Sequence, residues 1–406
     1  MAVRRAAGAA LATVLGTALG AAIALAAPSV ARAQADEFDG ASVIFARGAA
    51  LYRVDPRGKG ETEIAQLPAR TTVRALRSDA RGRVLLADLA GKWAWMPLDG
   101  SARALIELPC GDGPAALAED GSAVLCRSPK QPRQSILVEL AAAAAPPRVT
   151  ALDVPPGAAR LVGSGAERKL VWADQAGVWT APAADPRRKA RAALDVPLRG
   201  FLASPDGAHA IGVYTDQVFA DMHHQRAAEV LMTLQLDGQG ARRKAIRDGV
   251  AVEWSHDARW LLVQDGASTC IMRVSGGQYK CWRGLTAASL SADGRWALAL
   301  GNRDGSRQTA KSGKGKSAAR PGHPAPPTSD DSEPHHPDDK PWDHPDEPWD
   351  EPESADAPPP IDDVSVALPT GPLALYRLRL EGAFTDRPTL LVKVIDGAAV
   401  WIPGSP

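Results

Sequence analysis

The sequence predicts an all-β protein, a β-propeller most simply built from seven four-stranded blades. Turn signals rich in Asp and Gly recur at intervals of about 40 residues, and an apolar strand follows each of them. The stretch between two turns has room for four short strands, several with alternating apolar and polar residues. Trp is the commonest aromatic residue, with 11 copies against 4 Tyr and 5 Phe, which suits broad apolar layers between blades.

The repeated unit can be followed along the chain from its turns. In order, the turn signals are Asp39–Gly40, Asp79–Gly82, Glu119–Gly121, Gly163–Gly165, Ser204–Gly207, Ser255–Asp257 and Ser291–Gly294. One strand leads into each turn, a strongly apolar strand leaves it, and a third and a fourth strand complete the unit. A single blade leaves both of its faces exposed, so a ring of blades is needed to cover them. The long step before Ser255 and the weak fourth unit keep six or eight blades as alternatives.

The two ends of the repeat region predict how the ring closes. No strand precedes the turn at Asp39–Gly40, and nothing follows the strand-like segment Gly397–Gly404. We therefore expect this last strand to be the innermost strand of the first blade. Such a clasp pairs both ends of the ring and leaves few open sheet edges.

Three turns carry a resemblance to a known family. The motif Ser204-Pro205-Asp206-Gly207 and its variants Ser291–Gly294 and Trp254–Asp257 resemble the S-P-D-G turn of WD40-like repeats in TolB-type propellers. The resemblance covers most of the body outside one insertion. It implies a propeller, and because TolB-type propellers are periplasmic interaction scaffolds, it implies a binding protein. The motif residues form a turn, so the resemblance assigns no functional residue.

The first 35 residues read as a signal peptide. Arg4 and Arg5 precede an apolar run, and small residues offer cleavage after Ala33 or Ala35. The alternative is an uncleaved anchor, since the run is long enough to span a bilayer. We expect an exported protein, periplasmic or extracellular, that is a monomer with its propeller in residues 36–302 and 365–406.

The four cysteines agree with export, because an even number in an oxidising compartment favours disulfides. Cys110 and Cys126 are one expected pair. Cys270 and Cys281 are the other: a hairpin turn at Ser275-Gly276 places them opposite each other on neighbouring strands. Four buried free thiols are the alternative, and no C-x-x-C spacing suggests zinc.

Residues 303–364 differ in composition from the rest of the chain. They contain 7 cationic and 15 acidic side chains and 13 prolines, so they cannot bury enough apolar surface to fold, and we expect a disordered loop between two strands of the last blade. Trp342 and Trp349 are candidate contacts for a protein partner. A further hypothesis is that histidines among the acidic residues bind a metal ion, with His335, His336 and His344 as the candidate ligands. The alternative is that the segment is a solvated tether.

Charge and motifs exclude several function classes. The 47 basic and 47 acidic residues balance, which argues against a nucleic-acid binder driven by bulk charge. No nucleophile elbow, zinc-protease motif or phosphate-binding loop is present, and no cofactor is expected. A candidate polar cluster lies in the long fifth unit, at Asp221, His223 and His224; a solvated hairpin loop is the alternative. His209 and His256 stand beside turns and are expected to form hydrogen bonds within turns or between blades.

These observations favour an exported, non-enzymatic binding or scaffold propeller that offers loops and the acidic insertion to a protein or envelope partner. The alternative is a hydrolase or lyase acting on glycan or peptide at the mouth of the channel. Acids and His converging at that mouth would support the enzyme, whereas a channel lined by small and apolar side chains would argue against it.

Overall fold

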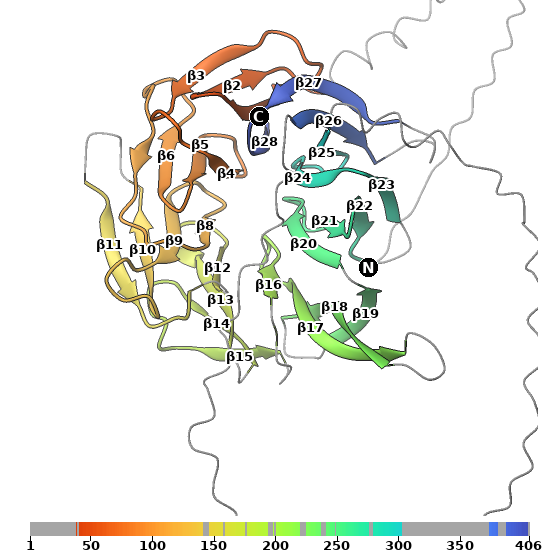
Figure 1. The fold of residues 1–406 in the computed structure, drawn as a ribbon. Coiled ribbons are helices and arrows are strands. Elements are labelled where there is room, and N and C mark those ends of the chain that lie inside the picture. The colour runs from red at the N-terminus through yellow and green to blue at the C-terminus, as the bar shows by residue number, and fades with distance from the viewer. Residues whose placement is uncertain are drawn as a thin grey trace, which may run out of the picture. The chain divides into compact units, whose positions relative to one another are not determined.

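Seven four-stranded antiparallel sheets form a closed ring in the computed structural model of the chain (Figure 1). The fold class predicted from the sequence, including the number of blades, is therefore confirmed. The structure describes residues 38, 40–140, 146–156, 159–174, 177–193, 198, 200–219, 225–236, 241–247, 249–275, 279–302, 373–380 and 387–404. All the strands belong to one compact unit that begins at Gly40.

Within each blade the strands follow one another from the axis of the ring outward. Blade 1 is β28 (Ala399–Ile402), β1 (Ser42–Arg47), β2 (Ala50–Val54) and β3 (Thr62–Gln66). Blade 2 is β4 (Val73–Ser78), β5 (Val84–Leu89), β6 (Trp93–Pro97) and β7 (Ile106–Glu107). Blade 3 is β8 (Ala115–Leu117), β9 (Ala123–Arg127), β10 (Ser135–Glu139) and β11 (Arg148–Leu152). Blade 4 is β12 (Ala159–Val162), β13 (Lys169–Asp174), β14 (Gly177–Pro182) and β15 (Ala190–Ala193), with a short 3-10 turn at Gly165–Glu167.

The remaining blades follow the same order. Blade 5 is β16 (Gly200–Ala203), β17 (His209–Phe219), β18 (Gln225–Gln235) and β19 (Ala241–Arg247). Blade 6 is β20 (Gly249–Trp254), β21 (Trp260–Asp265), β22 (Ser268–Arg273) and β23 (Tyr279–Arg283). Blade 7 is β24 (Thr286–Leu290), β25 (Trp296–Asn302), β26 (Leu373–Arg379) and β27 (Thr389–Ile395).

The ring closes as the sequence predicts. Strand β28, the last of the chain, pairs antiparallel with β1, and Val43 lies opposite Trp401. Trp401 also connects to the blades on either side, because its N–H donates to Ser289 Oγ at 3.2 Å and its carbonyl accepts from Ser78 Oγ at 3.1 Å. The clasp therefore joins blades 7, 1 and 2 through one short strand.

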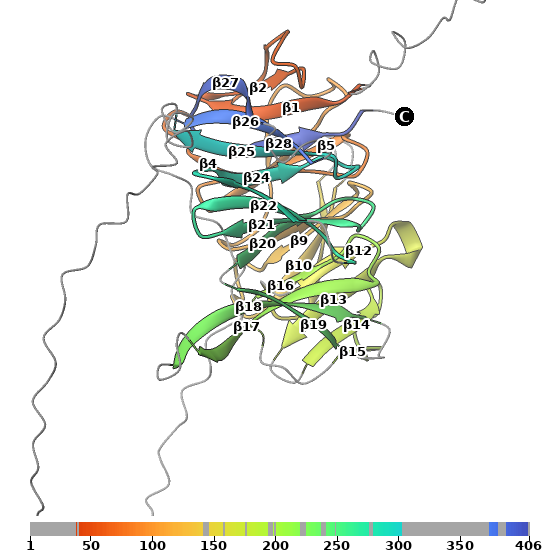
Figure 2. The ribbon, with the colours of Figure 1, turned by 90° about the vertical axis from the view of Figure 1, so that its right-hand side faces the viewer.

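Seen from the side, the strands of the blades run between the two faces of the ring (Figure 2). We call the face where the innermost strands end the turn face, because the Asp/Gly turns between the first and second strands lie there. The opposite face is the insertion face: β25 ends there at Asn302 and β26 begins there at Leu373, and these two residues are paired. Residues 303–372 thus connect two paired strands of blade 7.

The Asp/Gly turns are held by a repeated set of hydrogen bonds. In blade 7, Ser291 Oγ donates to Asp293 Oδ1 at 2.6 Å and accepts from the N–H of Trp296 at 2.9 Å. The Asp293 carboxylate also accepts from the N–H of Arg295 at 3.0 Å. Short polar side chains that bond to nearby backbone stabilise turns in this way, which explains why Ser and Asp recur at these positions.

The apolar core lies in layers between neighbouring blades. One cluster joins blades 3 and 4 around Leu125, Leu161 and Trp172, and similar clusters join blades 1 and 2, 2 and 3, 4 and 5, 5 and 6, and 6 and 7. The Trp residues that were expected to pack between blades are mostly buried; those with at most 8% of their surface exposed are Trp93, Trp95, Trp172, Trp254, Trp282, Trp296 and Trp401. Each blade buries its faces against the two neighbouring blades, so a single blade needs its neighbours to be stable.

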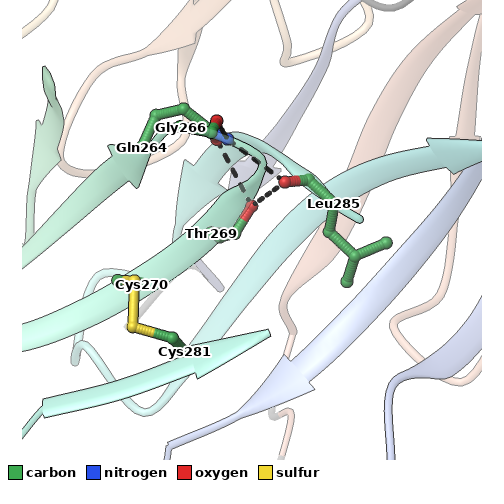
Figure 3. Close-up of a disulfide and its surroundings, with 6 residues drawn as sticks. All are labelled: Gln264, Gly266, Thr269, Cys270, Cys281 and Leu285. Atoms are coloured by element: carbon green, nitrogen blue, oxygen red, sulfur yellow. Dashed lines mark hydrogen bonds between the residues drawn. A yellow bond between two sulfur atoms is a disulfide. The ribbon is translucent and has the colours of Figure 1, made fainter. Parts of the chain in front are cut away.

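Both expected disulfides form. Cys110 bonds to Cys126 and Cys270 bonds to Cys281, so no free thiol remains. Cys270 and Cys281 are directly opposite each other on β22 and β23 (Figure 3). Next to this pair, Thr269 Oγ1 donates to the Leu285 carbonyl at 2.9 Å, and Gln264 Nε2 donates to the same oxygen at 3.3 Å (Figure 3). Blade 6 is therefore bonded inside itself and to the segment that enters blade 7.

Candidate functional site

The seven innermost strands surround the axis of the ring (Figure 1). Residues from all seven of them line a central channel. Its cavity has a volume of about 260 Å³. Many lining side chains are small or apolar, but six ionisable ones also line it: Arg74, Arg77, Glu119, Arg160, Glu253 and His256. The condition that would have argued against an enzyme, a channel lined only by small and apolar side chains, is therefore not met.

The mouth of the channel at the turn face is crossed by one side-chain bond. Glu119 is the second residue of the four-residue turn Ala118–Gly121 in blade 3, and His256 is the second residue of the turn Ser255–Ala258 in blade 6. These blades are not neighbours in the ring, yet Nδ1 of His256 lies 2.9 Å from Oε2 of Glu119. Each side chain is 27% exposed, so the pair lies at the border between solvent and the channel.

Backbone hydrogen bonds extend this bridge to two further blades. The N–H of Ala80 in blade 2 donates to the Glu119 carbonyl at 3.0 Å. The N–H of His256 donates to the Ala292 carbonyl of blade 7 at 3.2 Å. A continuous chain of bonds thus crosses the mouth from blade 2 to blade 7 through the Glu119–His256 pair.

The electrostatic surroundings of His256 favour its charged form. Burial lowers the pKa of the imidazole, but the hydrogen bond with Glu119 and the negative charges of Glu119, Glu253 and Asp79 outweigh it, so the pKa of His256 is raised. At a pH below this raised pKa the bridge is an ion pair as well as a hydrogen bond.

Glu253 forms a second charged layer below the mouth. Its Oε2 accepts from the N–H of Leu290 at 2.6 Å, and a hydrogen bond with Ser289 and the charge of Arg77 also act on it. Burial is the largest influence and raises the pKa of Glu253. Glu253 and Arg77 stand at the same position of their strands, two residues before the turn, in blades 6 and 2.

Bulges in three innermost strands help to turn side chains toward the axis. The register shifts between Val73 and Ala75, between Ala251 and Glu253, and between Ala287 and Ser289. The extra residues are Arg74, Val252 and Ala288, and all three line the channel. A bulge bends a strand and redirects its side chains, so these blades expose to the channel residues that regular pairing would direct between blades.

A larger hollow lies between blades 3 and 4. It has a volume of about 1070 Å³, and its walls come from β10, β11, β13 and the segments at the turn face of blade 4. Leu137, Leu152 and Trp172 form apolar parts of the wall. Charged residues of both signs line it as well: Glu139, Arg148, Asp153, Arg168, Asp174, Asp185, Arg187 and Lys189. We call this hollow the blade 3–4 groove.

A polar junction holds the two walls of the blade 3–4 groove together at the turn face. Asp120 Oδ2 accepts from the N–H of Gly165 at 2.9 Å and from Nη2 of Arg168 at 3.2 Å. Burial raises the pKa of Asp120, but the hydrogen bonds from Ser122 and Gly165 and the charge of Arg168 outweigh it and lower the pKa to about 2. The carboxylate is therefore ionised at any physiological pH.

Most of the site residues predicted from the sequence lie outside the described residues. This holds for Asp221, His223 and His224 of the fifth unit, and for the whole of 303–364 with Trp342, Trp349, His335, His336 and His344. The strands around the first cluster are longer than expected, since β17 and β18 stay paired as far as Phe219 and Gln225. Among the residues that the structure does describe, no group of three or more His, Cys, Asp or Glu side chains could hold a metal ion.

His256 was noted in the sequence as a residue beside a turn, and its bond between blades agrees with that interpretation. Glu119, Glu253 and Arg77 were not singled out. A signal for Glu119 was available, because the second turn position is Pro205 in blade 5 and Ala292 in blade 7 but is charged in blades 3 and 6. The same turn position in every blade lies near the axis of the ring, so charged side chains at this position in two blades can contact each other.

Comparisons with known proteins leave the function open. No protein-family model matches the chain, and no curated protein is similar to it in sequence. Solved structures similar to it include a putative TolB from Agrobacterium tumefaciens, at 14% identity over 60% of this chain and 88% of that one, with a TM-score of 0.37. TolB from Acinetobacter baumannii matches at 12% identity over 58% and 62% of the two chains, with a TM-score of 0.40.

Enzymes are also among the similar structures. Hydrazine synthase from Kuenenia stuttgartiensis matches at 10% identity over 56% of this chain and 73% of that one, with a TM-score of 0.40. The propeller fold predicted from the turns is confirmed by the seven four-stranded blades. In the described part of the chain, no helix is long and apolar enough to cross a membrane.

Proposed function

We propose that this protein is an exported, non-enzymatic binding propeller that presents the blade 3–4 groove and the insertion 303–364 to a protein or envelope partner. The observation that carries the proposal is the contrast between the two hollows of the ring. The channel measures about 260 Å³ and is crossed by the Glu119–His256 pair, whereas the groove measures about 1070 Å³. Ligand sites commonly occupy about 300–1,000 Å³, so the groove has the size for a partner segment.

The lining of the groove also suits a protein. Charged residues of both signs line the groove, and the core side chains Leu137 and Trp172, 6% and 3% exposed, contribute only to its floor. A polar, charged rim of this kind is found around protein interfaces. Arg148 is the most exposed of the paired cations there, with 79% of its side chain exposed. Balanced charge selects for a partner that carries both signs, rather than for a nucleic acid.

The insertion adds a second contact in this proposal. Its ends, Asn302 and Leu373, are paired in the sheet, so blade 7 remains intact at the point where this acidic segment leaves it. Trp342 and Trp349 are the side chains that we propose as its contacts. Export rests on the sequence of residues 1–35 and on two disulfides that an oxidising compartment sustains.

The test compares four mature proteins in cross-linking pull-downs from envelope extract, followed by binding of the purified partner to each. They are the native protein, a variant with residues 303–364 replaced by a short Gly/Ser linker, Arg148→Glu with Arg187→Glu, and Arg259→Glu. Arg259 is 75% exposed on the turn of blade 6 and serves as the matched control. We expect the groove variant to lose at least about tenfold in affinity, which corresponds to about 1.4 kcal/mol. Equal binding by all four proteins would contradict the proposal.

A second candidate is an enzyme of the hydrolase or lyase class acting on glycan or peptide at the channel mouth. The convergence of Glu119, Glu253 and His256 on the channel favours it. Against it, Glu119 and His256 are bonded to each other, and a Glu253 oxygen is occupied by the Leu290 N–H. Turnover of glycan or peptide substrates that is lost in Glu119→Gln and in His256→Gln, but kept in the groove variant, would favour the enzyme over the binding protein.

A further inference from the structure

The bond between Glu119 and His256 joins two blades that are not neighbours in the ring. The two residues are 137 positions apart in the sequence, and they belong to blades separated by at least two others. Together with the backbone bonds of Ala80 and Ala292, this pair connects opposite sides of the ring. Bonds of this kind are not needed to close a propeller, because the clasp of β28 already does so.

We propose that the Glu119–His256 pair is a proton-operated latch that closes the channel at the turn face. With His256 protonated, the imidazolium and the carboxylate attract each other and hold the mouth closed. With His256 neutral, the hydrogen bond loses its charge, the bridge weakens, and the layer of Glu253 and Arg77 below it becomes open to solvent. This inference concerns the ring itself and holds whichever partner the protein binds.

The direction of the response follows from the groups that face His256. Glu119 from the turn of blade 3, Asp79 from the turn of blade 2 and Glu253 from its own strand are all acidic, and each favours the protonated ring. Arg77 faces Glu253 from blade 2 and acts on that carboxylate. The pKa of the ring is raised in the folded protein, so the latch is closed below the ordinary pKa of His and opens as the pH rises through the raised value.

The first measurement is the titration of His256 in the whole mature protein by NMR of the imidazole nitrogens. Its resonance is identified by its loss in His256→Gln. Titration in the native protein and in Glu119→Gln gives the part of the pKa shift that comes from Glu119. We expect the pKa of His256 to be lower in Glu119→Gln. An unchanged pKa would overturn the proposal, whatever the stability of the variant.

The second measurement tests closure. Ala288 lines the channel below the level of Glu253 and is half-buried, and the native protein has no free thiol, so Ala288→Cys introduces a single reporter. Its rate of modification by a bulky maleimide is measured against pH in three backgrounds: native, His256→Gln and the control His209→Gln. Dividing the native rate by the His256→Gln rate at each pH removes the intrinsic reactivity of the thiol.

We expect this ratio to be low at acid pH and to rise toward 1 above the raised pKa. The rise should be about tenfold for each unit of pKa shift measured by NMR, since one pKa unit corresponds to a tenfold change in the equilibrium. The His209→Gln background should follow the native curve. A ratio that does not change with pH would overturn closure of the channel, because access to the reporter thiol would then not depend on the charge of His256.

Discussion

Exchanging Gly294 for Ala tests whether the Asp/Gly turns carry the contacts between blades. Gly294 has a φ of +69°, and a Cβ built on it would lie 2.2 Å from Cδ1 and 2.7 Å from Cγ of Trp260 in blade 6. Gly48 is a matched control: its φ is +58°, but a Cβ there would have nothing within 4 Å. Both exchanges share the same backbone penalty, and only the first adds a clash with the preceding blade.

The two costs can be estimated separately. Ala at positive φ costs about 1–2 kcal/mol, and the lower entropy of the unfolded Ala chain offsets about 0.4–1 kcal/mol of that. Gly48→Ala should therefore lower the free energy of unfolding by about 0.5–1 kcal/mol. Overpacking adds about 1–3 kcal/mol, so Gly294→Ala should lower the free energy of unfolding by about 1.5–4 kcal/mol in total.

The assay is urea unfolding followed by Trp fluorescence, with both disulfides intact and with circular dichroism to confirm that each variant folds. A smaller side chain at the neighbouring position provides a rescue: Trp260→Ala should remove most of the difference between Gly294→Ala and its own parent. Equal losses in Gly294→Ala and Gly48→Ala would refute the reasoning, because the turn glycine would then be needed only for its backbone conformation.

Three further exchanges follow from single observations. Ala258 occupies the glycine position of the blade 6 turn with a φ of +55°, so Ala258→Gly should raise the free energy of unfolding by about 0.5–1 kcal/mol in urea titrations; a loss would show that its buried methyl group matters more. Burial raises the pKa of Glu253, so the free energy of unfolding should fall by up to about 1.4 kcal/mol per pH unit as the pH rises above the ordinary pKa of Glu. Glu253→Gln should flatten that part of a plot of stability against pH. An unchanged slope would show that other groups cause it. The pKa of Asp120 is lowered to about 2. Asp120→Asn should therefore lower the free energy of unfolding by on the order of 1 kcal/mol at neutral pH, after allowance for solvent screening, and by little near pH 2. A loss that is independent of pH would indicate lost hydrogen bonds alone.

The parts of the fold that sequence could predict are those that local chemistry determines. A Ser–Asp–Gly turn is specified by four residues, and its recurrence predicts the number of blades. Cys270 and Cys281 could be paired because they lie on two strands of one hairpin, where the turn sets the register. The clasp of β28 followed from counting strands at the two ends. Each of these inferences used only neighbouring residues or the period of the repeat.

The contents of the channel could not be predicted in the same way. Glu119 meets His256 only because the ring brings the second turn positions of blades 3 and 6 to one mouth, and that geometry depends on the size and curvature of the whole ring. The bulges at Arg74, Val252 and Ala288 are also absent from the periodic pattern, since one extra residue in a short strand resembles ordinary variation. The blade 3–4 groove depends on how far two blades splay, which no local motif encodes.

Burial of charged groups near the axis costs free energy of folding, and this cost bears on the function of the channel. Replacing a buried ion pair by apolar side chains is often neutral or stabilising, and the raised pKa of Glu253 shows that its charged form is disfavoured where it stands. Binding of partners through the rim alone makes no use of the charges of Glu253, Arg77 and the Glu119–His256 pair. Titratable groups with shifted pKa values in a cleft are candidates for function. A role of the channel mouth and partner binding by the blade 3–4 groove can therefore be tested separately. If Glu119→Gln changes partner binding as strongly as the groove variant does, the channel mouth communicates with the groove. If Glu119→Gln leaves partner binding unchanged while it alters the pH dependence of channel closure, the channel mouth and the groove act independently.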